Sequence, residues 1–282
     1  IASFNKPGGI TFCHENAHVA EDECGAVEYL TGGPRLSLIP GADGKMDLAT
    51  LEKAIARNPA AFVHGGQPMG ITITQATEAG TVHALDEIRA ISAIAKSNNL
   101  PLHMDGARFA NALVSLGCTP AEMTWKSGVD ILSFGATKNG CWCAEAIVVF
   151  DKALDAQMPF LRKRGAQLFS KSRFIAAQFE AYFEGDLWLD SARHANAMAT
   201  VLAEGIAKSG RARLHTKPQA NEVFAILTNA DIERLRAAGA VFYDWHAPSD
   251  GSVKHGETMI RLVTSFATRL EEADNLIARI KT

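Results

Sequence analysis

The chain has 282 residues, of which 47% are apolar and 21% are charged, and its formal net charge at pH 7 is −3. This composition is ordinary for a globular protein, and the length allows one large domain or two unequal ones. The chain lacks the basic surplus typical of nucleic-acid binding, and its longest apolar runs are too short to span a bilayer.

The cysteines are few and irregularly spaced. The chain has five, an odd number, and no CxxC pair; they are Cys13, Cys24, Cys118, Cys141 and Cys143. A disulfide framework is not expected from such a pattern in a chain of this length. We therefore expect free thiols and a cytoplasmic protein.

The first part of the chain, residues 1–160, alternates apolar runs typical of strands with helical patterns. The expected strands are 10–13, 36–39, 71–74, 101–104, 130–134 and 146–150, and the expected helices are 47–57 and 82–96. Asp47 stands where a helix N-cap is expected, and 71–74 is β-branched throughout. Strands that alternate with helices predict an α/β domain with a mostly parallel sheet.

The pattern changes beyond residue 160. A linking helix is expected over 161–185, followed by a smaller α+β domain over 186–282. The elements expected in this domain are helices at 187–209, 231–238 and 268–281 and strands at 222–227 and 258–264. The chain is thus predicted to have a large domain, a linking helix and a small C-terminal domain.

Candidate reactive residues stand at the predicted carboxyl ends of two strands, where parallel α/β sheets collect their ligands. Asp105 ends "PLHMDGAR", Arg108 follows it, and Lys138 follows "ILSFGAT". Each residue alone is typical of a turn or a helix cap. Together, a lysine and an acid suit pyridoxal phosphate, because the lysine can form a Schiff base with its aldehyde and the acid can keep its ring nitrogen protonated.

A second pattern, His14-Glu15-Asn16-Ala17-His18, matches the H-E-x-x-H signature of zinc proteases. On a helix its two histidines would share one face and bind zinc. The motif directly follows a predicted strand, however, and no third ligand stands at the expected spacing. We therefore expect no metal site and treat a zinc peptidase as an alternative.

Three stretches, "HENAHVAEDECGA", "LHMDGARFANALVSLG" and "ILSFGATKNG", resemble the low-specificity L-threonine aldolases. The resemblance covers nearly the whole chain in the same order. It implies a pyridoxal phosphate enzyme of fold type I, the aspartate aminotransferase fold. It also implies cleavage of β-hydroxy-α-amino acids to glycine and an aldehyde, in a homotetramer with shared active sites.

The resemblance implies a role for each of six residues. Lys138 forms the Schiff base, Asp105 pairs with the pyridine nitrogen, and His18 stacks on the ring. Arg108 and Arg261 bind the substrate carboxylate. A looser match assigns Arg173 to the cofactor phosphate of a neighbouring subunit. A planar guanidinium suits the carboxylate role, since it can donate two parallel hydrogen bonds.

The chain also departs from the family pattern. The glycine-threonine turn that binds the phosphate belongs to a segment before residue 1, so we expect the start of the large domain to be missing. Many members carry a histidine where this chain has Glu78, which leaves the base for the β-hydroxyl open between His18, a water and Glu78. The alternatives to an aldolase are a β-eliminating lyase or aminotransferase of the same fold, the zinc peptidase, and a non-catalytic relative.

Overall fold

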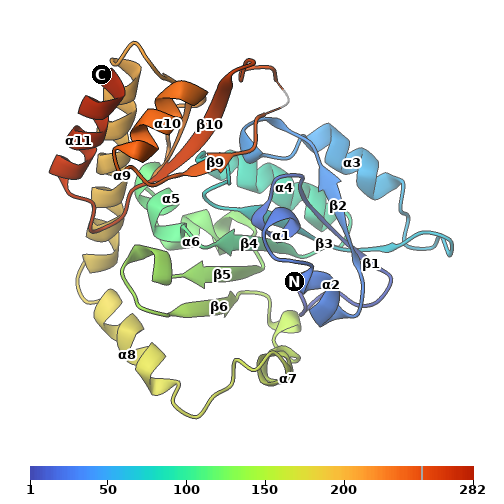
Figure 1. Cartoon of the computed structure of the whole chain (residues 1–282). Helices are drawn as coiled ribbons and strands as arrows, with labels where there is room; N and C mark the ends of the chain where they lie inside the picture. The colour runs from blue at the N-terminus through green and yellow to red at the C-terminus, as the bar shows by residue number, and fades with distance from the viewer. Residues whose placement is uncertain (249) are drawn as a thin grey trace.

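The computed structural model describes residues 1–248 and 250–282, and its two sheets differ in size and direction (Figure 1). The larger sheet contains β1 (Gly9–His14), β2 (Arg35–Ile39), β3 (Gln67–Thr74), β4 (Leu102–Gly106), β5 (Ile131–Gly135) and β6 (Glu145–Val149). Its order is β2-β1-β3-β4-β5-β6, and every pair is parallel except β5–β6. The predicted mostly parallel sheet is therefore confirmed.

Helices follow most strands of the larger sheet. They are α1 (His18–Glu21), α2 (Ala26–Thr31), α3 (Leu48–Ala56), α4 (Leu85–Ser97), α5 (Phe109–Leu116) and α6 (Pro120–Met123). Asp47 caps α3 as expected, because its carboxylate accepts a hydrogen bond of 2.8 Å from the Thr50 amide. Ile88 and Ile91 of α4 are fully buried in the core of this sheet.

The segment 161–185, expected as one linking helix, is divided between two shorter helices in the lower part of Figure 1, and Phe179 and Tyr182 of the second pack against Phe134 of β5. These are α7 (Met158–Arg164) and α8 (Arg173–Tyr182). The chain leaves the helix after α7 because Gly165 caps it and Ala166 takes a left-handed φ of 58°. The long α9 (Leu187–Ala207) then runs past α5 to the small sheet.

The smaller sheet is antiparallel and has the order β7-β8-β10-β9. Its strands are β7 (Arg213–Leu214), β8 (Glu222–Thr228), β9 (Tyr243–Trp245) and β10 (Glu257–Val263), and its helices are α10 (Asn229–Ala237) and α11 (Leu270–Lys281). Alternate residues of β8 and β10, such as Val223 and Ile260, pack against α9, α10 and α11. The other residues of these two strands lie on the opposite face.

In the described residues, no helix combines the length and the apolar character needed to cross a bilayer.

Candidate active site

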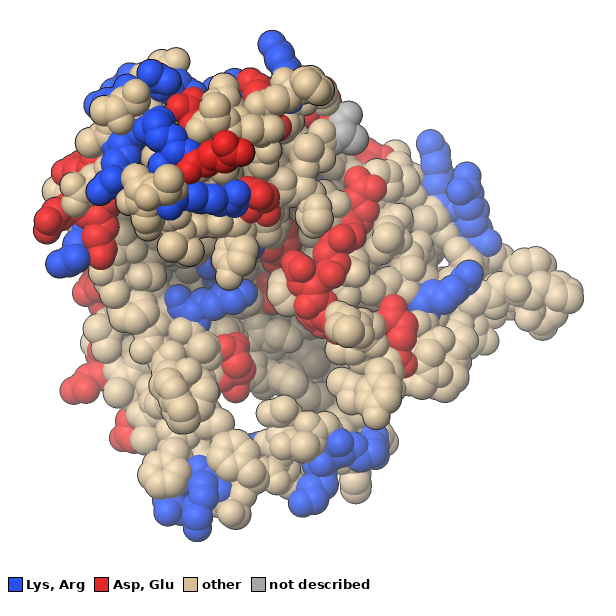
Figure 2. Space-filling model, viewed as in Figure 1, with Lys and Arg blue, Asp and Glu red and all other residues tan. Residues whose placement is uncertain are grey.

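A cavity of about 410 Å³ lies at the carboxyl ends of β3, β4 and β5, beside α1 and α2. Asp105 lines it from β4, Lys138 from the turn after β5, and His18 from the start of α1. The space-filling view shows a hollow with acidic and basic side chains near its rim (Figure 2). Its size and position are those of small-molecule sites in α/β sheets.

The turn that carries Lys138, Thr137–Asn139, is anchored by its neighbours. The buried Asn139 side-chain amide donates hydrogen bonds of 2.6 Å to the Tyr182 hydroxyl and 2.8 Å to the Trp188 carbonyl. Lys138 itself remains exposed. Its side chain therefore extends from a backbone that is fixed on both sides.

Asp105 lies close to this turn because the chain is tightly packed there. A Cβ atom on Gly135 would lie 2.8 Å from the Cα and carbonyl oxygen of Ala107, so a larger residue would push the turn away. The Ala107 amide donates a 3.0 Å hydrogen bond to Asp105 Oδ1. The carboxylate is thus oriented by the backbone that follows its own strand.

The floor of the cavity is a hydrogen-bonded row across β3, β4 and β5. His103 Nδ1 lies 2.7 Å from Thr72 Oγ1, and its Nε2 lies 2.9 Å from Ser133 Oγ. Burial holds the pKa of His103 well below its usual range, so the ring is neutral. Both ring nitrogens have partners, and the row forms a rigid, uncharged floor.

The two histidines of the H-E-x-x-H pattern do not share a helix face. His14 ends β1, and its Nε2 lies 3.1 Å from the Gly41 carbonyl oxygen. His18 begins α1, and its Nδ1 lies 3.1 Å from Glu23 Oε1. Among residues 1–248 and 250–282 no group of three or more side chains could hold a metal ion.

Arg108 and Arg261 meet at a third residue that the sequence analysis missed, Glu222. Arg108 Nη2 lies 2.8 Å and Arg261 Nη1 3.6 Å from Glu222 Oε1. The Glu222 side chain is 1% exposed, against 12% for Arg108 and 20% for Arg261. A carboxylate this deeply buried needs such partners, because an unpaired buried charge is costly.

Strand alternation is the signal that could have revealed Glu222. Arg261 pairs with Phe224 in the register of β8 and β10, so Arg261 and Glu222 are diagonal neighbours on the face opposite the helices. The Arg261 guanidinium also lies 4.1 Å from the Trp245 ring centroid, and within the described residues its buried Nε has no hydrogen-bond partner. The guanidinium is therefore held by an aromatic ring on one side and by Glu222 on the other.

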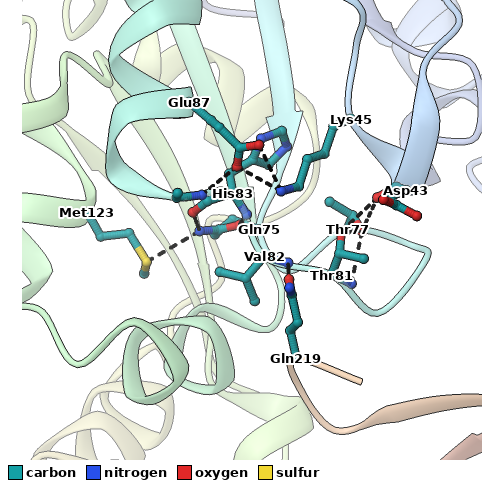
Figure 3. Close-up of polar contacts among 11 residues, drawn as sticks. Asp43, Lys45, Gln75, Thr77, Thr81, Val82, His83, Glu87, Met123 and Gln219 are labelled. Carbon is teal, nitrogen blue, oxygen red and sulfur yellow. Dashed lines mark hydrogen bonds and ion pairs between the residues drawn. The ribbon is translucent and has the colours of Figure 1, made fainter. Parts of the chain in front are cut away.

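Glu78 lines the cavity from the loop between β3 and α4. Figure 3 shows the contacts that hold this loop. Thr77 Oγ1 and Thr81 Oγ1 donate hydrogen bonds of 3.1 and 2.7 Å to the Asp43 carbonyl oxygen. The Val82 amide donates one of 2.7 Å to Gln219 Oε1. The sequence analysis left Glu78 as one of several candidate bases, and the fold brings it to Lys138 and Asp105.

Arg173 does not reach the cavity of its own chain. It starts α8, is exposed, and lies 4.8 Å from the ring centroid of its neighbour Phe174. Arg108 and Arg261 are not among the lining residues either. Of the two, Arg108 has a charge that acts on the Glu78 carboxyl of the cavity, as does their common partner Glu222.

A lysine at the end of one strand, an acid on the neighbouring strand and an imidazole beside them define a class of protein, the pyridoxal phosphate enzymes of fold type I. The residues fit that cofactor. Lys138 offers an amine to its aldehyde, Asp105 a carboxylate to its ring nitrogen, and His18 a flat ring to its face.

Comparison with known proteins narrows the class. The family model for beta-eliminating lyases matches residues 1–230. The low specificity L-threonine aldolase of Pseudomonas aeruginosa is 42% identical over 95% of this chain and 75% of its own length. A second Pseudomonas enzyme of the same name is 44% identical over 82% of this chain and 66% of its own length.

Solved structures agree with this result. The threonine aldolase of Leishmania major is 29% identical, with a TM-score of 0.89 over 99% of this chain and 79% of its own. A pyridoxal phosphate-bound protein from Clostridium difficile shares the fold at 14% identity and a TM-score of 0.71, covering 99% of this chain and 72% of its own. The chain belongs to the beta-eliminating lyase family and, within it, to the low-specificity L-threonine aldolases. The predicted fold class, family and cofactor are confirmed, and the chain is a pyridoxal phosphate-dependent lyase.

Proposed function

We propose that this chain cleaves the Cα–Cβ bond of L-threonine, L-allo-threonine and related β-hydroxy-α-amino acids to give glycine and an aldehyde. The observation that carries the proposal is the common cavity of Lys138, Asp105 and His18. Family membership selects the reaction, since the matched relatives are named low-specificity L-threonine aldolases.

Pyridoxal phosphate, when bound, supplies an aldehyde for an amine and a protonated ring that accepts the electron pair of the broken bond. Lys138 would hold the cofactor through its amine. Asp105, whose carboxylate is fixed by the Ala107 amide, would keep the ring nitrogen protonated. His18, which lies 3.1 Å from Glu23, would cover the ring.

Arg108 and Arg261 bind the substrate carboxylate in this proposal. They come from different sheets and converge on Glu222. A carboxylate held by two guanidiniums fixes the rotation about Cα. The two guanidiniums would thereby set which bond at Cα is presented to the chemistry that the cofactor supplies.

We extend the proposal to assembly and location. A homotetramer in which Arg173 reaches the cofactor phosphate of a neighbouring subunit accounts for the position of Arg173 outside its own cavity. It also accounts for exposed aromatic side chains around α7 and α8; these are Trp142, Phe160, Phe169 and Phe174. The five free cysteines support a reducing, cytoplasmic location. Light scattering of the active enzyme tests the assembly, and a fully active monomer would contradict it.

Product analysis with L-threonine tests the reaction. Release of acetaldehyde and glycine in equal amounts supports the aldolase. Release of 2-oxobutanoate and ammonia would instead identify a β-eliminating lyase, and amino transfer to a 2-oxo acid an aminotransferase.

A further inference from the structure

We propose that Glu78 is the catalytic base that takes the proton from the β-hydroxyl group of the substrate. This inference rests on the proposed aldol cleavage and deepens it. It selects one of three candidates, of which the sequence had favoured His18 or a water over Glu78.

Among the described acidic residues that line the cavity, Glu78 alone has no hydrogen-bond or ion-pair partner. Three acidic side chains line the cavity: Glu23, Asp105 and Glu78. Glu23 is paired with His18 Nδ1, and Asp105 accepts a hydrogen bond from the Ala107 amide. Within the described residues the Glu78 carboxylate makes no hydrogen bond or ion pair, so its oxygens are available to a ligand.

The loop that carries Glu78 is held in place by contacts from two parts of the chain, one beside the larger sheet and one beside the smaller sheet. Thr77 and Thr81, on either side of Glu78, both bond to the Asp43 carbonyl oxygen (Figure 3). On the side of the small sheet, the Gln219 amide donates a 3.0 Å hydrogen bond to the Gly80 carbonyl oxygen. Gly80 has a φ of +72°, and a Cβ atom there would lie 3.1 Å from the Glu222 carbonyl oxygen. A base held this firmly can act without reorganisation.

The electrostatic surroundings of Glu78 also suit a base. Burial, and second the charge of Glu222, raise the pKa of the Glu78 carboxyl. The nearby Arg108 and Lys138 charges oppose this rise. A carboxylate with a raised pKa is a stronger base than an exposed one, and it stands beside the lysine that holds the cofactor.

His18 is the weaker candidate on geometry. Its Nδ1 lies 3.1 Å from Glu23 Oε1, so one ring nitrogen already has a partner, whereas both oxygens of Glu78 are without one in the described residues. In the proposed function His18 would cover the cofactor ring, a role separate from removal of the hydroxyl proton.

The proposed step balances without an added reagent. Glu78 accepts the hydroxyl proton, and the electron pair of the O–H bond forms the C=O bond of the aldehyde. The electrons of the Cα–Cβ bond stay with Cα, which takes up one proton to give glycine. Glu78 returns its proton to solvent, so threonine yields glycine and acetaldehyde with no oxidant or reductant.

The test is Glu78→Gln in the full chain loaded with pyridoxal phosphate. We expect the absorbance of the bound cofactor and the exchange of the glycine α-proton with D2O, followed by NMR, to remain within about 3-fold of wild type. Acetaldehyde release from L-threonine should fall by roughly 10²-fold or more, the usual contribution of a general base. Glycine has no β-hydroxyl, so its exchange does not need this base.

A second measurement, of the melting temperature, does not require catalytic activity. A carboxylate whose folded-state pKa is raised destabilises the fold at pH above its ordinary value, because the folded form favours the protonated acid. Glu78→Gln should therefore raise the melting temperature of the cofactor-free chain at pH 7–8, and the difference should shrink as the pH falls toward 4.5. A merely structural Glu78 would give a lower melting temperature instead.

The control is Glu52→Gln, which removes an exposed carboxylate of α3 and should change neither readout. Cleavage by Glu78→Gln at more than a third of the wild-type rate overturns the role of Glu78, as does an equal loss of cleavage and glycine exchange. Retention of glycine exchange with loss of cleavage in His18→Phe would transfer the role to His18. A wild-type chain that releases no acetaldehyde would instead refute the aldolase function itself.

Discussion

Lys138 and Asp105 stand at the ends of parallel strands in the larger sheet, whereas Arg261 and Glu222 lie on antiparallel strands of the smaller one. At the strand ends the backbone turns away, and side chains extend into a cavity. On the small sheet the charged groups are packed against each other and an indole ring. The first region is suited to covalent chemistry with a cofactor, and the second to holding an anion in one orientation.

The strongest test of this contrast is Lys138→Ala. We expect acetaldehyde release to fall by at least about 10³-fold, because Lys138 is the only lysine among the described residues that line the cavity. The cofactor absorbance that borohydride removes should also disappear. Lys152→Ala, on an exposed turn after β6, is the matched control. A Lys138→Ala protein that keeps this absorbance, with no other lysine labelled, would show that Lys138 does not bind the cofactor.

Glu222→Ala tests whether Arg108 and Arg261 depend on their ion pairs with Glu222 for stability. Removing the carboxylate leaves two partly buried guanidiniums without their common partner, and we expect a loss of roughly 2–4 kcal/mol in the free energy of unfolding. Urea unfolding measures this loss. Glu204→Ala, which removes an exposed ion pair with Lys208, should leave the unfolding midpoint nearly unchanged. Equal effects of the two substitutions would show that burial does not distinguish these pairs.

The free energy of unfolding should decrease in acid because of His83, which lies between β3 and α4. Burial, with a smaller contribution from Lys45, lowers the pKa of His83 from 6.5 to about 4. The unfolded chain therefore binds the proton first, and stability is lost as the pH falls from about 6.5 to 4, by on the order of 3 kcal/mol.

The measurement is the melting temperature across this pH window. In His83→Asn the dependence should be shallower than in wild type, while His255→Asn on an exposed turn should leave it unchanged. An identical slope in His83→Asn would place the acid sensitivity elsewhere.

The mildest expected effect is that of Arg261→Lys. Lysine keeps the charge but loses the planar pair of donors. We expect KM for L-threonine to rise by about 10-fold with kcat changed much less, whereas Arg279→Lys on the exposed face of α11 should behave as wild type. A fall in kcat at constant KM would mean that Arg261 acts in the bond-breaking step rather than in substrate binding.

The sequence by itself determined the strands of the larger sheet, β8 and β10 of the smaller one, the helices α3, α4, α9, α10 and α11, and the meeting of Asp105 with Lys138 at one cavity. It did not predict β7, β9 or the shorter helices α1, α2, α5 and α6. Hydrophobic patterns and glycine turns are local, and parallel strands bring their carboxyl ends to one edge. The expected strand before the H-E-x-x-H pattern is also present, since His14 ends β1.

Only the tertiary structure decided the surroundings of these residues. The contact of Glu222 with Arg108 joins residues 114 positions apart and depends on the packing of the small sheet against the large one. The Glu78 loop is held by Gln219, 137 positions beyond Val82. No local pattern encodes such contacts, since they arise when two separately patterned units pack together. The break between α7 and α8 likewise depended on the backbone at Gly165 and Ala166, within a segment whose composition favours helix.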